Sequence, residues 1–292
     1  MPALAALFLF LFAGPLGAFD DRPELQPYAL LEGKLAGESS AWLKSPSLKN
    51  VYWTLNDSGN APVIFAFTRD GKLIKPEAAA DAAYKGVVVS GAANRDWEAL
   101  AADDKGNLIV GDIGNNRNRR KNLAVYIVPE PDPWQEQVSS AAQKVMFRYP
   151  DQENFPPAEM NFDAEALFWS GGRLHLLTKH RSDTRTRLYR FESLEPGSTQ
   201  TLKLVSSFDV KAMATDAALS PDGKKLAVLT YDGAWLFEKP GKTDNYFSGA
   251  GRRFAFGAGQ CEGLTFDGPD TLLVSNEGGE LFEIKLSSFT RY

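Results

Sequence analysis

Short apolar runs alternate along the chain with turns rich in glycine, aspartate and asparagine. Residues 51–55 (VYWTL) are followed by NDSG, residues 226–230 (LAVLT) by YDG, and residues 272–274 (LLV) by SNEGG. Short runs of β-branched and aromatic residues that end in this way are typical of β-strands joined by tight turns. The pattern therefore predicts an all-β fold.

One five-residue phrase recurs at the start of successive groups of these runs. It reads DWEAL at residues 96–100, DAEAL at 163–167, TDAAL at 215–219 and QCEGL at 260–264, with a weaker copy, SSAW, at 39–42. The aligned phrases lie between 45 and 67 residues apart, a spacing typical of β-propeller blades. The alignment makes five positions equivalent: Ser40, Glu98, Glu165, Ala217 and Glu262.

The apolar runs give each repeat the four strands of a propeller blade. The last repeat ends at Tyr292 without its outer strand, whereas an unassigned run at residues 28–35 precedes the first phrase. We therefore predict a five-bladed β-propeller in which this N-terminal strand completes the fifth blade and closes the ring, which removes exposed sheet edges. A six-bladed ring with one degenerate blade, a β-sandwich and a solenoid are the alternatives.

The first 18 residues differ from the rest of the chain. An apolar run of about ten residues (3–12) is followed by GPLGA and then by the acidic start FDD. This pattern is typical of a secretory signal peptide, although no basic residue precedes the apolar run and the large Leu16 lies two residues before Ala18. The sequence predicts a signal peptide at 1–18, one propeller domain at 19–292, and export to the periplasm or out of the cell. A retained N-terminal anchor is the alternative.

The composition of the chain limits the kinds of molecule that the protein is expected to bind. A net charge of −5 argues against binding to nucleic acid, and no stretch of the predicted mature chain is apolar enough to cross a membrane. The single cysteine, Cys261, has no histidine beside it in the sequence, so we interpret it as a packed thiol. The motifs of α/β-hydrolases, phosphate-binding loops and zinc proteases are absent from the sequence. We expect a monomer that acts on an anionic small molecule or an ester.

Three of the equivalent positions carry a glutamate that should face the central channel, because the first strand of each blade lines it. Two carboxylates about 5 Å apart repel by about 3 kcal/mol at an effective dielectric near 20, so raised pKa values or a bound cation must offset the repulsion. A site made only of oxygen ligands favours the binding of Ca²⁺ over that of zinc, which prefers histidine and cysteine. The sequence thus predicts a calcium site, with the acids capping strands through backbone N–H groups as the alternative. The predicted ligands are Ser40, Glu98, Glu165, Asp216 and Glu262.

The blade openings resemble those of extracytoplasmic calcium propellers. Residues 261–266 (CEGLTF) are similar to blades of the phytase-like esterase family. The order Ser, Glu, Glu, weak position, Glu is similar to the channel ring of the calcium-activated nucleotidases, which are five-bladed apyrases with one central calcium. This resemblance implies that Ser40, Glu98, Glu165 and Glu262 bind calcium, while Ala217 departs from the serine expected in the fourth blade. It covers only the blade openings, and activity does not follow from shared architecture.

Basic residues follow the second strands of two adjacent blades. The loops after these strands should emerge on the same face as the phrases, which brings residues 115–120 (NNRNRR) and 179–181 (KHR) to one rim. Arginine forks bind phosphate or carboxylate through paired hydrogen bonds. A solvated hairpin is the alternative, and for Asn115 and Asn116 turn geometry is the interpretation. The predicted substrate-binding residues are Arg117, Arg119, Arg120, Lys179, Arg181 and Tyr231.

Two functions fit these features. The first is a calcium-dependent hydrolase of a phosphorylated or other ester substrate, in which the ion is the electrophile. The second is a non-catalytic propeller with structural calcium, whose rim binds a glycan, a peptide or a partner in the cell envelope. For the first function, the candidate general bases are Asp57, Asp96, Asp112 and His180.

Overall fold

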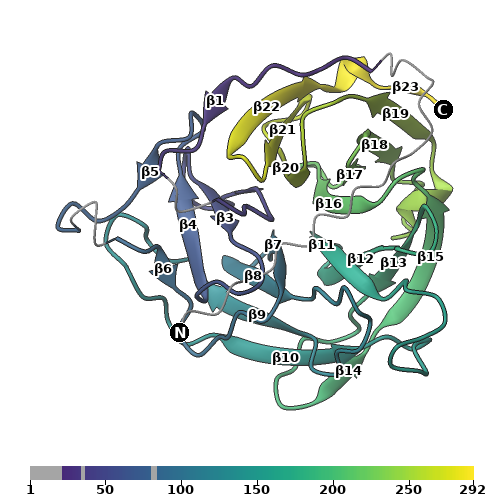
Figure 1. Cartoon of the computed structure of the whole chain (residues 1–292), viewed down its shortest axis with the longest axis horizontal. Coiled ribbons are helices and arrows are strands. Elements are labelled where there is room, and N and C mark those ends of the chain that lie inside the picture. Colours follow the sequence, from purple (N-terminus) through teal and green to yellow (C-terminus); the bar gives the residue numbers. More distant parts are fainter. Residues whose placement is uncertain (1–21, 34–36, 80–83) are drawn as a thin grey trace, which may run out of the picture.

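Five small sheets surround a central axis in the computed structural model of the chain (Figure 1). The structure describes residues 22–33, 37–79 and 84–292. The predicted signal peptide at residues 1–18 lies outside the described residues, as do residues 34 and 35 of the predicted closing strand. The prediction of an all-β, five-bladed propeller is confirmed.

Each sheet is one blade, and its strands follow one another from the axis outward. The inner strands are β2 (Leu43–Lys44), β7 (Trp97–Ala102), β11 (Asp163–Ser170), β16 (Ala214–Leu219) and β20 (Cys261–Phe266). The second strands are β3 (Tyr52–Leu55), β8 (Asn107–Asp112), β12 (Arg173–Lys179), β17 (Lys225–Thr230) and β21 (Thr271–Asn276). The third strands are β4 (Val63–Phe67), β9 (Ala124–Pro129), β13 (Arg185–Arg190), β18 (Gly233–Glu238) and β22 (Glu280–Lys285).

The fourth strands form the outside of the ring. They are β5 (Leu73–Ile74), β10 (Gln143–Arg148), β15 (Lys203–Asp209), β19 (Gly251–Ala255) and β1 (Ala29–Leu30). Three short strands add to the blades: β6 (Val87–Val88) on β4, β14 (Thr199–Thr201) on β10, and β23 (Thr290–Arg291) on β19. Two 3-10 turns, η1 (Tyr246–Ser248) and η2 (Leu286–Ser288), complete the elements. No helix among the described residues is long and apolar enough to span a membrane.

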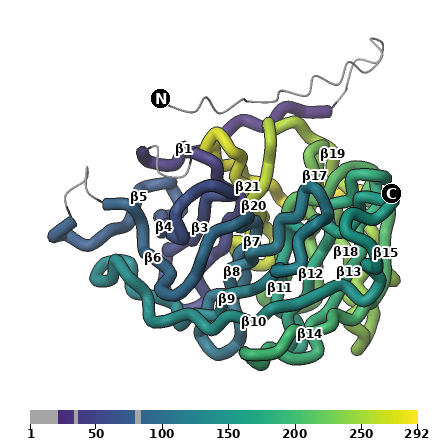
Figure 2. The backbone as a smooth tube through the Cα atoms, turned by 60° about the horizontal axis from the view of Figure 1, so that its bottom comes forward, coloured from purple at the N-terminus to yellow at the C-terminus, as the bar shows by residue number. Residues whose placement is uncertain are grey.

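The N-terminal strand closes the ring. Strand β1 pairs antiparallel with β22, and Figures 1 and 2 show this purple segment beside the yellow C-terminal strands. Backbone hydrogen bonds from Tyr28 N to Leu281 O (2.8 Å) and from Leu31 N to Gly279 O (2.8 Å) extend the pairing. The closure predicted from the sequence is therefore confirmed, although the regular strand covers only Ala29–Leu30.

A close backbone contact joins the closing segment to the first blade. The amide of Glu32 donates to the carbonyl of Gly71 at 2.7 Å. Gly71 has a φ of +80°, and a Cβ at this position would lie 2.3 Å from the carbonyl oxygen of Leu30. Only glycine fits both the backbone conformation and the space. The segment therefore links the fifth blade to the first.

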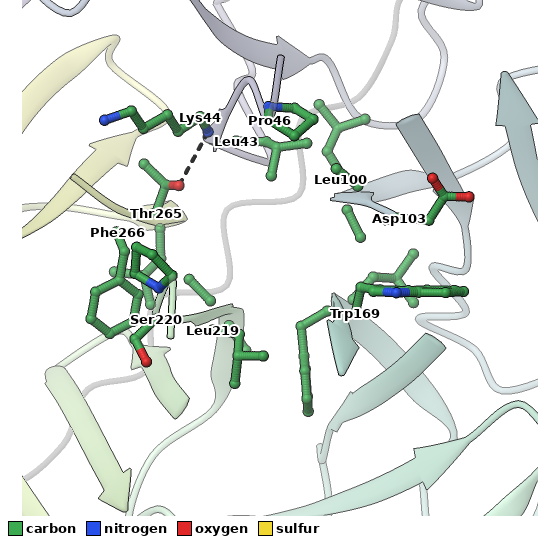
Figure 3. Close-up of a pocket in the computed structure, with 18 of the residues that line it drawn as sticks. Leu43, Lys44, Pro46, Leu100, Asp103, Trp169, Leu219, Ser220, Thr265 and Phe266 are labelled. Atoms are coloured by element: carbon green, nitrogen blue, oxygen red, sulfur yellow. Dashed lines mark hydrogen bonds between the residues drawn. The ribbon is translucent and has the colours of Figure 1, made fainter. Parts of the chain in front are cut away.

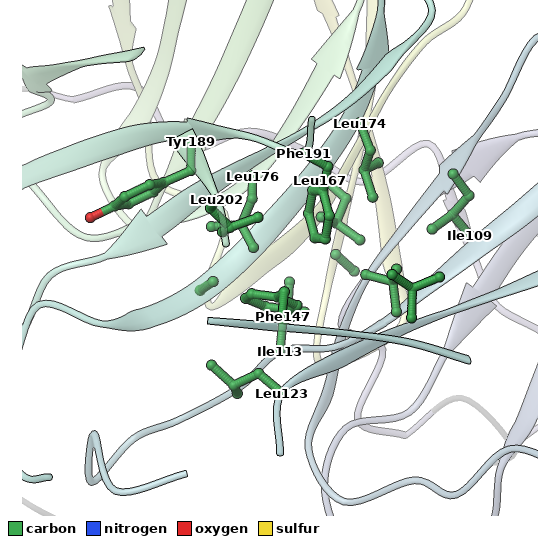
Figure 4. Close-up of a cluster of buried hydrophobic side chains, with 14 of the residues drawn as sticks. Ile109, Ile113, Leu123, Phe147, Leu167, Leu174, Leu176, Tyr189, Phe191 and Leu202 are labelled. Carbon is green, nitrogen blue, oxygen red and sulfur yellow. The ribbon is translucent and has the colours of Figure 1, made fainter. Parts of the chain in front are cut away.

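Apolar side chains of neighbouring blades meet between the sheets. Between the second and third blades, Ile109 and Phe147 pack in one cluster with Leu174 and Tyr189, and each is at most 1% exposed (Figure 4). Burying one large apolar side chain contributes about 1.5–3 kcal/mol. These layers fix the blades relative to one another and hold the inner strands around the axis.

The repeated phrase corresponds to a β-bulge in the inner strand. In the second blade, the residues on either side of Glu98 pair with consecutive residues of β8, so Glu98 has no partner in the ladder. In the first blade, Ser40 holds the corresponding place, because Ser39 bridges to Asn56 before β2 begins. A bulge redirects a side chain, and here it does so at the same level of each blade. The same shift leaves three further residues unpaired: Glu165, Thr215 and Glu262.

This register corrects one position of the sequence alignment. The fourth-blade equivalent of Glu98 is Thr215 and not Ala217, which corresponds to Leu100 instead. A shift of two residues leaves the alternation of side chains between the two faces of a strand unchanged, so the hydrophobic pattern cannot detect it. Only the hydrogen-bond ladder fixes the register.

Candidate functional site

Residues from all five blades surround the channel on the face where the phrases begin, which we call the upper face. The bulge residues form the bulge ring, and each is at most 6% exposed: Ser40, Glu98, Glu165, Thr215 and Glu262. In four blades, a residue at or just after the end of the second strand also lies at this opening, and these residues form the mouth ring: Asp57, Lys179, Tyr231 and Glu277.

Lys179 brings a positive charge into the channel. Its Nζ lies 3.0 Å from Oε1 of Glu165 and 4.0 Å from Oε1 of Glu262. It also donates a hydrogen bond to the hydroxyl of Tyr231 (2.9 Å), which in turn donates to Oε1 of Glu262 (2.7 Å). Burial would lower the pKa of Lys179, but Glu165, Tyr231 and Glu262 together raise this pKa well above its usual value. The ammonium group therefore stays charged.

The position of Lys179 differs from the sequence prediction. We predicted Lys179 and Tyr231 on the substrate-binding rim, but both side chains contact the acids of the channel. The repulsion between the glutamates required a cation or raised pKa values, and the molecule uses both. Burial, followed by the charge of Glu165, raises the pKa of Glu98 well above its usual value. Burial also raises the pKa of Glu165, against the opposing effect of Lys179.

Asp216 caps backbone groups. Its two carboxylate oxygens accept hydrogen bonds from the amide of Ala217 (2.7 Å) and from the amide of Leu264 (2.6 Å) in the next blade. The hydroxyl of Thr215, the bulge residue, donates to the carbonyl of Cys261 at 2.7 Å. These contacts join the fourth and fifth blades. They match the alternative in which acids at the blade openings bind backbone N–H groups.

The donor set of the channel does not fit calcium in this arrangement. Within the part of the chain that the structure describes, no three carboxylate, imidazole or thiol groups lie close enough to hold one metal ion. Both oxygens of Asp216 are occupied by backbone amides, and Lys179 lies between Glu165 and Glu262. A divalent cation at this place would meet the ammonium group at short range. The predicted ligands therefore do not converge on a calcium position.

Two carboxyl groups approach the same side of Gly114. A Cβ added to Gly114 would lie 2.6 Å from Oδ2 of Asp96 and 2.6 Å from Oε1 of Glu98, so both groups contact the same point of the backbone. Burial, followed by the charge of Asp163, raises the pKa of Asp96 to about 6. Asp96 adds in turn to the shift of Glu98. Asp96 and Glu98, which we call the carboxyl pair, thus have raised pKa values at the mouth of the channel.

A basic pocket of about 460 Å³ opens beside the carboxyl pair. Among its lining residues, Arg95, Arg117 and Arg119 are exposed and form no ion pair with any described residue. Arg120 is held by Oδ1 of Asp112 (2.7 Å) and by the carbonyl of Gly114 (2.6 Å). We call this site the arginine pocket, and it is lined by Ser58, Arg95, Asp96, Asn115, Asn116, Arg117, Arg119 and Arg120.

The sequence predicted three of the four arginines of this pocket. Arg95 was missed, although it directly precedes the phrase that begins at Asp96. Its position beside a residue expected at the channel mouth was the available signal. Of the two asparagines, Asn115 has the structural role expected of it: its amide N–H donates to Asp163 (2.6 Å) and its side-chain oxygen accepts from the amide of Arg120 (2.9 Å).

Three further predicted residues are held by internal contacts. Arg181 donates through Nε (2.9 Å) and Nη2 (2.8 Å) to Oδ2 of Asp163, which holds it beside the pocket. Asp112 is fully buried, and its Oδ1 accepts from Arg120 and from the amide of Asp96 (3.1 Å). His180 Nδ1 lies 2.6 Å from Asp183, and burial lowers the pKa of this histidine. No described contact brings His180 to the carboxyl pair.

Asp57 lies at the channel mouth. It is half-buried, and burial followed by the charge of Glu38 raises its pKa to about 7. The charges of Glu262, Asp96 and Glu277 also contribute to this shift, so acids of several blades lie close enough to Asp57 to affect its pKa. Of the four candidate bases predicted from the sequence, Asp57 and Asp96 therefore lie at the upper opening with pKa values near neutrality.

Comparisons with known proteins identify a fold and no family. No family model matches the chain, and no curated protein matches it. Among solved structures, the PQQ-bound aldose sugar dehydrogenase of Streptomyces coelicolor is similar, with a TM-score of 0.50 and 12% sequence identity. The similarity covers 90% of this chain and 97% of that enzyme. At this identity the comparison supports the propeller fold alone.

Proposed function

We propose that the protein is an exported hydrolase that binds an anionic ester on the upper face of the propeller. The observation that carries the proposal is the arginine pocket with Asp96, a carboxyl group of near-neutral pKa, in its wall. Export rests on the apolar run at residues 3–12. An anion site beside a carboxyl pair supplies the two things that ester hydrolysis needs, which are substrate binding and proton transfer.

The charge of the pocket selects the substrate. Arg95, Arg117 and Arg119 have no ion-pair partner among the described residues, so an incoming anion does not have to displace a carboxylate. Guanidinium groups bind phosphate and carboxylate oxygens through charge-assisted hydrogen bonds. The protein as a whole has a net charge of −5, whereas this pocket is positively charged. The pocket would therefore attract an anion locally.

The carboxyl pair divides the acid and base roles. At pH 7 a group of pKa about 6, as Asp96 has, is mostly ionised and can accept a proton. Burial and the charge of Glu165 raise the pKa of Glu98 well above its usual value, which favours the protonated form that can donate a proton. The charge of Asp96 raises the pKa of Glu98, so the protonation of Glu98 depends on the charge state of Asp96.

The reaction follows from this division. A water molecule transfers a proton to Asp96, while the oxygen of this water forms a bond to the phosphorus or carbonyl carbon of the ester. The bond from this atom to the leaving oxygen breaks, and Glu98 transfers its proton to that oxygen. The two carboxyl groups then exchange the proton through water and return to their first state. Calcium has no part in this proposal, because no three acids among the described residues lie close enough to hold one ion.

Hydrolysis of p-nitrophenyl phosphate and p-nitrophenyl acetate tests the proposal. We expect Asp96→Asn to lower kcat by roughly 100-fold or more, the usual contribution of a general base. Replacing Arg117 and Arg119 together by alanine should instead raise KM for the phosphate ester. Asp222→Asn and Arg148→Ala are the matched controls, since both residues are exposed and lie away from the pocket.

Binding and turnover are measured separately. Turnover that is equal in the wild type and in Asp96→Asn would refute the catalytic role of the pair. Binding of phosphate without turnover of either ester would favour the non-catalytic propeller. Binding of phosphate is measured by titration. PQQ, an anion that the similar dehydrogenase binds, is titrated in the same way as a second anionic ligand.

A further inference from the structure

A second cavity, of about 450 Å³, opens at the opposite end of the channel from the carboxyl pair. The inner strands run from the bulges on the upper face towards this end, which we call the lower face. The cavity is lined by the ends of these strands and by the turns that follow them. All five blades contribute, with residues 43–46, 100–104, 167–169, 217–221 with 223, and 264–266 (Figure 3).

The inner wall of this lower cavity is apolar. Leu100, Leu167 and Leu264 lie two residues beyond the bulge glutamates of their blades and are at most 4% exposed. Strands rise about 3.3 Å per residue, so these leucines lie below the bulge ring and separate it from the cavity. Nearer the opening, the half-buried side chains of Leu219 and Trp169 add apolar surface (Figure 3).

The charged groups of the cavity are engaged or lie at its edge. Nζ of Lys44 donates to Asp267 at 2.6 Å. Asp103 accepts hydrogen bonds from the amides of Lys105 (2.8 Å) and Asn107 (2.9 Å). Asp104 is exposed. No free cation among the described lining residues could receive an anion, in contrast to the arginine pocket.

We infer that the lower cavity is a binding site for an uncharged, largely apolar small molecule such as a fused aromatic ring system. Its volume lies in the range of small-molecule sites, and most of its lining side chains are apolar and belong to the inner strands and the turns that follow them. Water in such a space finds few hydrogen-bond partners, so its release by an apolar ligand is favourable. The site is separate from the proposed hydrolytic site and does not depend on that function.

Titration with N-phenyl-1-naphthylamine, an uncharged aromatic probe whose fluorescence rises in apolar surroundings, tests this inference. We expect saturable binding with one site per chain. Leu219→Lys places a charge in the apolar opening and should weaken binding by about tenfold or more. Leu204→Lys is the matched control, because Leu204 is 43% exposed on the outer strand β15, and it should bind the probe as the wild type does.

A second variant keeps the test decisive if Leu219→Lys fails to fold. Ala102→Phe fills part of the cavity without adding charge and should also weaken binding. Inorganic phosphate should not compete with the probe, because it would bind on the upper face. The inference is overturned if the wild type shows no saturable binding, if Ala102→Phe binds as tightly as the wild type, or if phosphate displaces the probe.

Discussion

Nζ of Lys179 lies 3.0 Å from Oε1 of Glu165, and both side chains are less than 10% exposed. Lys179 comes from the second strand of the third blade and Glu165 from the bulge of the first strand, so the fold of a single blade creates the pair. The pair places one internal cation among the acids of the bulge ring. This cation offsets part of the repulsion between the glutamates, the role for which the sequence analysis predicted a bound metal ion.

Removal of this cation should destabilise the protein. In Lys179→Met the carboxyl groups of Glu165 and Glu262 lose their buried partner, which costs about 3–5 kcal/mol when one member of a buried ion pair is removed. Urea unfolding measures the loss. Lys285→Met, which removes an exposed ion pair with Glu283, should change stability by about 1 kcal/mol or less. Adding Glu165→Gln to Lys179→Met should recover part of the stability, and equal stability of the single and double variants would contradict the pairing.

The same variant tests calcium binding. We expect calcium to leave the melting temperature of the wild type unchanged, since Lys179 already lies among the acids. Lys179→Met leaves uncompensated oxygen ligands, so calcium should raise its melting temperature, because a ligand that binds only the native state stabilises it. Thermal melts with calcium and with chelator check this. A wild-type protein that loses stability in chelator would restore the calcium site predicted from the sequence.

Stability should rise as the solution becomes more acidic between about pH 8 and pH 5. The folded pKa values of Asp57, about 7, and Asp96, about 6, lie above the ordinary value of 3.8. The native state therefore binds more protons than the unfolded state in this window, and its stability falls as pH rises through the folded pKa values. Urea unfolding at several pH values measures the slope.

Asparagine substitutions identify the carboxyl groups that cause this dependence of stability on pH. Asp57→Asn and Asp96→Asn should each flatten it. Asp222→Asn should leave it unchanged, because hydrogen bonds from Ser220 and from the backbone lower the pKa of Asp222, so that this group stays ionised across the whole window. A slope that survives in the double variant Asp57→Asn with Asp96→Asn would assign it to other groups.

Gly114 should be required for the geometry of the carboxyl pair. In Gly114→Ala the new Cβ would lie 2.5 Å from Cγ of Asp96, so a carboxyl group or the backbone must move. Such overpacking costs about 1–3 kcal/mol. We expect this loss together with a fall in ester hydrolysis. Gly251→Ala, where the nearest atom is Cε1 of Phe237 at 3.3 Å, is the control and should retain hydrolysis.

The closing strand should be essential for folding. A chain that begins at Gly37 lacks β1, so the backbone of β22 loses its outer partner and the fifth blade exposes an apolar edge. We expect insoluble protein or a large loss of thermal stability, whereas a chain that begins at Phe19 should fold. Soluble protein with a cooperative melt from the Gly37 chain would show that closure is dispensable.

The sequence by itself determined the propeller and the place of its acids. Alternating apolar runs and turn residues predict strands wherever one face is buried, and the repeated phrase marks the start of each inner strand. These are local signals, so they identify Glu98, Glu165 and Glu262 without any knowledge of their neighbours. The missing outer strand of the fifth blade and the extra run before Ser40 likewise predicted the closure that β1 makes.

The tertiary structure decided what these acids contact. Two adjacent residues, Lys179 and His180, point to different surroundings, one to the channel acids and the other to Asp183. Sequence proximity could not separate them. The register of the fourth blade was fixed by the hydrogen-bond ladder, because a shift of two residues preserves side-chain alternation. The carboxyl pair depends on the backbone of Gly114 in the loop after β8, a contact that exists only after the chain has folded.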